Sequence, residues 1–131
     1  DFENLSEKWS TGAEYIALYP NVLLGVHRDH AYAIILLPLS FSETIENIHI
    51  YYSKPDTDPS LKKINKDQWK KIFEEDIFVV EGMQAGRLGI KFDGGRFSPK
   101  MDEPTHCFHD WVASKVDDFR NYKQQKTNVT E

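Results

Sequence analysis

The stretch from Asp67 to Gln84, DQWKKIFEEDIFVVEGMQ, constrains the fold most because it has the pattern of one amphipathic helix. At about 100° per residue, one face of that helix collects the apolar side chains and, among them, the carboxylate of Asp76. The apolar members of this stripe are Trp69, Ile72, Phe73, Val80 and Met83. A buried, unpaired carboxylate is costly, so we expect Asp76 to be protonated, paired with a donor or bound to a cation.

Two interpretations of Asp76 follow, and periodicity favours neither. In the first, the carboxylate is a structural group that is satisfied by a lysine, by backbone donors or by an arginine, namely Arg28, Arg87 or Arg96. In the second, it is a functional group that binds a cation.

The helix boundaries follow from capping and breaking residues. Asn65 can cap the first helix, with Gln68 three residues later, and that helix is expected to end near Gln84. The segment 85–95 contains four glycines, which excludes a continuous helix there. A second helix is predicted from Thr105 to Phe119, where apolar residues recur at spacings of three and four.

Four strand-like segments precede the helices, and short turns separate them. They cover residues 13–19, 22–26, 31–37 and 43–53, and residues 28–30 read as a turn. Consecutive strands followed by helices predict an α+β fold, with an antiparallel sheet and a long helix packed across one face. We expect a single domain over 1–131, with a lead-in at 1–12 that lacks a clear element and a frayed tail at 122–131.

Composition narrows the function classes. The net charge of −5 gives no electrostatic footprint for nucleic acid or for anionic membranes. No apolar run approaches the roughly 18 residues that a membrane span requires. Cys107 is the single cysteine, so one chain cannot form a disulfide or a cysteine-based cluster site, and a reduced thiol in the cytoplasm is expected.

Two histidine pairs are candidate metal ligands. His27 and His30 flank the predicted turn, and His106 and His109 are neighbours on one surface of the last helix. Either pair could combine with Asp76 as a 2-His-1-carboxylate iron site, although solvated histidines are the more common outcome at such positions.

Other groups are open to two readings. Gly94, Gly95 and Arg96 could cradle an anion, but a tight turn with positive φ is the favoured interpretation. The three tryptophans, Trp9, Trp69 and Trp111, are expected in a core or an interface.

Three phrases, in order and at matching spacing, resemble the C-terminal part of the catalytic α-subunit of Rieske-type non-haem iron oxygenases, the ring-hydroxylating group. The phrases are YPNVLLG (Tyr19 to Gly25), EEDIFVVEGMQAG (Glu74 to Gly86) and GGRFSPKMDEPTHCFHDWV (Gly94 to Val112). The resemblance extends from about Tyr15 to Val116. It implies a helix-grip (Bet v 1-like) fold, in which an antiparallel sheet packs on a long C-terminal helix, and this agrees with the order of strands and helices.

The resemblance also implies a role for Asp76. In this family two histidines and one aspartate hold a mononuclear iron, and the aspartate precedes a Glu-x-x-Gln pattern, here Glu81 to Gln84. The family's His-x4-His segment does not occur in these 131 residues, and its cluster motif of a CxH and a CxxH is excluded because Cys107 is the single cysteine. The four histidines named above do not sit where the family's ligands sit. We therefore expect the C-terminal portion of an oxygenase, with Asp76 as one of three iron ligands.

The implied chemistry is O₂-dependent hydroxylation of an aromatic or other small organic substrate. The implied cofactors are Fe(II) and a 2Fe-2S Rieske cluster in an N-terminal domain of the parent protein, and neither is expected in this chain alone, which should be inactive. The implied partners are that Rieske domain, an electron-transfer reductase and the other subunits of a homotrimer. Phe73, Val80 and Met83 could line the substrate pocket, although ordinary core positions are favoured. The alternative function is a non-catalytic helix-grip module that binds a small hydrophobic ligand.

Overall fold

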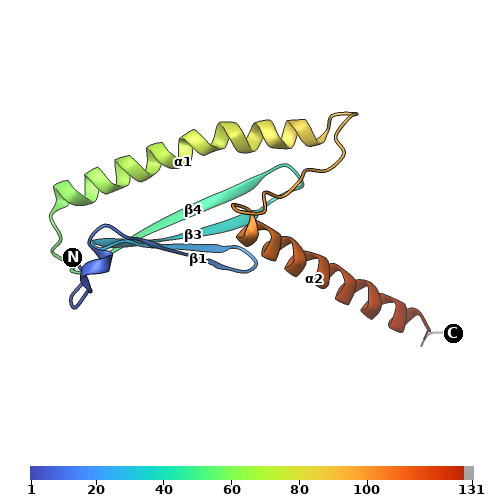
Figure 1. The fold of residues 1–131 in the computed structure, drawn as a ribbon, viewed down its shortest axis with the longest axis horizontal. Coiled ribbons are helices and arrows are strands. Elements are labelled where there is room, and N and C mark those ends of the chain that lie inside the picture. Colours follow the sequence, from blue (N-terminus) through green and yellow to red (C-terminus); the bar gives the residue numbers. More distant parts are fainter. Residues whose placement is uncertain (129–131) are drawn as a thin grey trace. The chain divides into compact units, whose positions relative to one another are not determined.

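The structure is a computed structural model and describes residues 1–128. The chain divides into two compact units, Asp1–Ile90 and Lys91–Glu131, which are described separately (Figure 1). That residues 1–131 act as one domain stays a prediction.

The first unit contains a four-stranded antiparallel sheet in the order β1-β2-β3-β4. Its strands are β1 (Glu14–Leu18), β2 (Val22–Val26), β3 (His30–Pro38) and β4 (Thr44–Tyr52). These bounds agree with the four predicted strands to within about one residue, except that His30, which was predicted to lie in the turn, begins β3. A short 3-10 helix, η1 (Glu7–Trp9), corrects the prediction that residues 1–12 lack an element.

The register of the sheet sorts its side chains onto two faces. Tyr32 pairs with Gly25 on one side and Ile50 on the other, and Ile34 pairs with Leu23 and Ile48, so all of them share one face. Tyr32 and Ile34 are the buried apolar residues of the described chain, with 7% and 5% of their surfaces exposed. The packed core therefore follows the middle of β3.

Helix α1 (Pro59–Arg87) follows β4 and lies along one face of the sheet (Figure 1). Asp58 caps it by accepting a hydrogen bond from the Ser60 backbone N–H at 2.8 Å, and Pro59 occupies the first turn, where its missing N–H costs nothing. The prediction that Asn65 caps this helix is wrong, because Asn65 lies inside the helix and is its buried residue. The predicted end at Gln84 is three residues early.

The length of α1 exceeds that of the sheet beneath it. At 1.5 Å per residue its 29 residues extend about 43 Å, whereas the nine residues of β3 extend about 30 Å. Exposed ion pairs one turn apart, such as Lys70 with Glu74 and Lys71 with Glu75, support the helix on its solvent side.

The second unit contains helix α2 (Glu103–Asn128), which is longer than the predicted Thr105–Phe119. The helix continues through residues 122–128, which were predicted to be a frayed tail, and residues 129–131 lie outside the described part. Asp102 organises its start: the Ser98 backbone N–H donates to the Asp102 carboxylate at 2.6 Å, and the His106 N–H donates to the Asp102 carbonyl at 2.8 Å.

The two units together have the α+β composition that the sequence predicts, with an antiparallel sheet and long helices. Within residues 1–128, none of the helices combines the length and the apolar content that crossing a bilayer requires.

Gly25 gives a direct test of this packing. A Cβ at Gly25 would overlap the ring of Tyr32, whereas a Cβ at Gly82 in α1 would meet no atom within 4 Å. We expect Gly25→Ala to lower the free energy of unfolding by about 1–3 kcal/mol through overpacking. The matched variant Gly82→Ala should raise it by up to about 1 kcal/mol through helix propensity. Urea denaturation followed by circular dichroism measures both, and equal effects of the two variants would contradict the packing described here.

Candidate functional site

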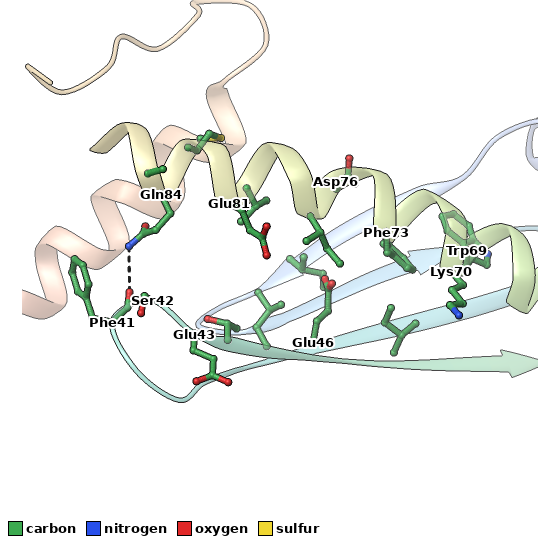
Figure 2. A pocket seen from close by; sticks show the side chains of 18 of the residues that line it. Phe41, Ser42, Glu43, Glu46, Trp69, Lys70, Phe73, Asp76, Glu81 and Gln84 are labelled. Atoms are coloured by element: carbon green, nitrogen blue, oxygen red, sulfur yellow. Dashed lines mark hydrogen bonds between the residues drawn. The ribbon is translucent and has the colours of Figure 1, made fainter. Parts of the chain in front are cut away.

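The main cavity of the first unit is a groove between α1 and the sheet, with a volume of about 1340 Å³ (Figure 2). This volume exceeds the roughly 300–1,000 Å³ of typical small-molecule pockets because the groove opens to solvent. The sheet supplies Leu23, Leu36, Ile48 and Ile50, and the β3–β4 loop supplies Phe41. The α1 side supplies Trp69, Phe73, Asp76, Ile77, Val80 and Met83.

The predicted metal ligand and the three predicted pocket residues therefore line the same groove. Phe73, Asp76, Val80 and Met83 extend over nearly three turns of α1. Their roles as pocket and metal-binding residues stay predictions. Phe73 is half-buried, whereas Val80 and Met83 are 62% and 56% exposed, so the expectation of an ordinary core position is wrong for these two residues.

Asp76 differs from the expectation drawn from helix periodicity. Asp76 is exposed, and Figure 2 shows its carboxylate on the side of α1 that faces away from the strands, so the prediction of a buried charge is wrong. The helix contacts the sheet around Trp69 and Phe73, and Asn65 is its buried residue. No hydrogen bond or ion pair to Asp76 is present within residues 1–128, and Arg28, one of its candidate partners, pairs with Asp1.

Acidic side chains gather in the groove beside the apolar ones. Figure 2 shows the carboxylates of Glu46 from β4 and Glu81 from α1 within the space between helix and strands. Burial, and secondarily the negative charge of Asp76, raises the pKa of Glu46 above its ordinary value. The groove thus combines an apolar floor with a rim on which carboxylates repel one another.

Two attachments hold α1 over the groove. Near the C-terminal end of α1, the Gln84 side-chain amide donates a hydrogen bond of 3.5 Å to the Phe41 carbonyl (Figure 2). Toward the N-terminal end, an aromatic cluster of Trp69, Tyr32 and Phe73 joins the helix to β3. Ring centroids are 4.5 Å apart for Tyr32 and Trp69 and 5.6 Å for Trp69 and Phe73. Burial, with a smaller contribution from Tyr15, raises the pKa of Tyr32.

The histidine pair of the β2–β3 hairpin belongs to this second attachment. His30 is only 7% exposed, so the expectation of a solvated turn histidine is wrong for it. Its Nε2 accepts a hydrogen bond from the Trp69 indole N–H at 2.7 Å, and its Nδ1 lies 2.8 Å from the Asp29 carboxylate. Both ring nitrogens of His30 are therefore occupied, which leaves no lone pair for a metal.

The second histidine pair has a structural environment in the second unit. His106 and His109 pack edge-on against the ring of Phe97, at centroid distances of 5.0 and 5.1 Å. His106 also pairs with Asp110 at 3.2 Å. Among residues 1–128, no group of three histidine, cysteine, aspartate or glutamate side chains could hold a metal ion.

The remaining candidates lie in ordinary structural settings. Gly94 has φ of +97°, which agrees with the tight-turn interpretation of the Gly94–Arg96 segment. The Lys8 ammonium lies 4.6 Å from the centroid of the Trp9 ring, and Trp111 is half-buried on α2. Cys107 is a free, exposed cysteine.

Sequence reasoning missed Glu46 and Asn65. Glu46 was not singled out from the sequence, and the register places it opposite Leu36 on the groove face. Asn65 looked like a helix cap because Gln68 follows at the capping-box spacing. Only the strand pairing and the helix position reveal what these two residues face.

One comparison with known proteins identifies a relationship. A family model described as the ring hydroxylating alpha subunit (catalytic domain) matches residues 1–118, which is most of the 131-residue chain. No curated protein and no solved structure matches the chain.

The coupling between the two groove carboxylates is measurable. We expect Asp76→Asn to lower the pKa of Glu46, because one of the two causes of its raised value is removed. Because folding raises the pKa of Glu46, ionisation of this carboxyl lowers the free energy of unfolding once the pH rises above the ordinary value of 4.5. Asp76→Asn should make this loss of stability smaller. Carboxyl-detected NMR titration measures the pKa. Asp67→Asn, which removes a carboxylate that pairs with Lys63, is the control and should leave Glu46 unchanged. An unaltered pKa of Glu46 in Asp76→Asn would show that the two charges do not interact.

Proposed function

The chain belongs to the family of ring-hydroxylating α-subunit catalytic domains, and from this premise we propose that it forms a substrate-binding part of an oxygenase. The substrate is an aromatic or other small organic molecule that is hydroxylated with O₂. One observation carries the proposal: Asp76, the residue matching the family's metal-binding aspartate, lines the same apolar groove as Phe73, Val80 and Met83.

The residues present do not by themselves fit a three-ligand iron site. Asp76 is one carboxylate, the His30 nitrogens are occupied, and the described residues contain no triad of metal-binding side chains. We propose that Asp76 supplies one ligand to Fe(II) and that two histidines come from polypeptide other than these 131 residues. Bound with an open face, such an iron would activate O₂.

The further components are proposed from family membership. A 2Fe-2S Rieske cluster in an N-terminal domain would supply electrons, and a reductase would reduce this cluster again. The functional assembly would be a homotrimer in the cytoplasm. The chain's own contribution is binding and positioning. The apolar floor from Leu23, Ile48 and Ile50 would exclude water from a substrate, and Phe73 would stack against an aromatic ring.

The groove also supports a second candidate function. Its apolar lining could bind a small hydrophobic molecule without any iron chemistry, as a non-catalytic module would. Both candidates predict ligand binding, and metal binding by Asp76 distinguishes them.

Ligand binding is tested with neighbouring valines of α1. Val80 lines the groove and is 62% exposed, whereas Val79 is 55% exposed and is not part of the lining. An uncharged aromatic probe, N-phenyl-1-naphthylamine, should bind the chain with increased fluorescence. Val80→Glu should weaken its affinity about tenfold, because a carboxylate must lose water when the probe binds. Val79→Glu should change it little, and equal losses in both variants would contradict the groove as the binding site.

Metal binding is tested by anaerobic calorimetric titration with Fe(II). We expect weak binding by this chain, because one carboxylate cannot hold the ion as three ligands do, and we expect no oxygenase turnover. Asp76→Asn should remove part of the weak binding heat, whereas Asp67→Asn should not. Tight one-to-one binding by the unaltered chain would contradict the proposal that the other ligands come from elsewhere. Identical heats for Asp76→Asn and the unaltered chain would favour the non-catalytic module.

A further inference from the structure

The tautomer of His30 follows from its partners. An indole N–H can only donate, so the Trp69 hydrogen bond at 2.7 Å requires a bare lone pair on His30 Nε2. The proton of the neutral ring then sits on Nδ1 and donates to the Asp29 carboxylate at 2.8 Å. The Nδ2 atom of Asn65 lies 3.4 Å from the same Nδ1. The neutral form of His30 with its proton on Nδ1 satisfies both Trp69 and Asp29.

A second proton on His30 would disrupt this arrangement. It would place an N–H on Nε2 facing the Trp69 N–H, so two donors would meet at hydrogen-bonding distance inside a site that is largely closed to water. The Trp69 indole would have to move away.

The neighbouring His27 adds to this effect. Its ring stacks on His30 with parallel planes, 4.8 Å between centroids, and its Nε2 is buried without a hydrogen-bond partner. Burial, followed by the charge of His30, lowers the pKa of His27 below its ordinary value of 6.5, although Asp29 opposes the change. The folded form therefore prefers neutral His27. The stability that follows from this preference is complete above pH 6.5 and declines as the pH falls toward the lower pKa of the folded state.

Other groups from each packed element surround the two rings. Tyr15 from β1 lies edge-on to His27, Tyr32 from β3 lies 6.0 Å from His27, and Tyr52 from β4 lies 6.3 Å from His30. The Glu14 side chain of β1 lines the same small pocket as His27. From α1, the Lys62 ammonium lies over the Tyr52 ring at 5.6 Å. In the hairpin loop, Arg28 pairs with Asp1, and the Asp29 carboxylate lies 2.8 Å from His30 Nδ1.

Movement of Trp69 would reach the groove directly. Trp69 stacks on Phe73, both rings contact Tyr32, and both line the groove. Since Asn65 is the buried residue of α1, the attachment of the N-terminal half of the helix rests on this small cluster.

We propose that the hydrogen bond from Trp69 to His30 is an acid-sensitive latch that holds the N-terminal half of α1 against the sheet. At neutral pH the latch is closed and Trp69 forms the end wall of the groove. Protonation of the stacked His27–His30 pair opens it, releases Trp69 toward solvent and alters the groove. This device is independent of the proposed oxygenase function.

The experiment follows Trp69 fluorescence from pH 8 to pH 5 in a chain carrying Trp9→Phe and Trp111→Phe. We expect the emission maximum to shift to longer wavelength on acidification, within the range in which histidines titrate. His30→Gln should abolish the shift, because a glutamine carbonyl oxygen can accept the indole hydrogen bond without titrating. His106→Gln, which alters an exposed histidine of the second unit, is the control and should leave the shift intact.

Two results would overturn the latch. One is a chain whose Trp69 emission does not change between pH 8 and pH 5, and the other is a shift that persists in His30→Gln. Should His30→Gln fail to fold, nitrogen-15 NMR of the histidine rings decides. The latch requires the Nδ1–H tautomer of His30 at pH 8, and an Nε2–H tautomer would overturn it.

Discussion

Trp69 and His30 fix the point at which helix α1 meets the sheet, and much of the first unit depends on that contact. The hydrogen bond of 2.7 Å between them is directional, whereas the surrounding contacts of Tyr32 and Phe73 are aromatic packing with broad geometric tolerance. A directional bond in a small, largely dry cluster determines both the register and the rotation of the helix. Asn65 is buried beside this hydrogen bond, with its side chain next to the His30 ring.

The groove is the consequence of anchoring a long helix near one end. Close packing ends after Phe73, and the hydrogen bond from Gln84 to Phe41 joins the helix to the β3–β4 loop at the other end. Between these two attachments, apolar side chains of helix and sheet face a shared space and do not interlock. Asp76 is exposed, and its carboxylate lies on the side of α1 that faces away from the strands, where it avoids the cost of burial.

Several features of the fold could be predicted from local sequence. The four strands follow from runs of β-branched and aromatic residues bounded by turns, and α1 follows from its apolar period. The errors came from tertiary contacts. Asn65 fits a capping position, but Pro59 and Asp58 start the helix earlier with better local chemistry. His30 fits a turn in the sequence, but it pairs with Tyr52 as the first residue of β3 and contacts Trp69 of α1.

The sequence by itself determined the α+β architecture, the amphipathic face of α1 and the candidates Phe73, Asp76, Val80 and Met83, because periodicity and motif are local properties of the chain. Only the tertiary structure decided that these four residues line an open groove with Glu46 across from them, and that His30 is hydrogen-bonded to Trp69 while His27 stacks on it. Burial and hydrogen-bond partners depend on which segments meet in space. A helical period identifies the face that turns toward the sheet, but the separation between the two surfaces is set by the few residues that anchor them.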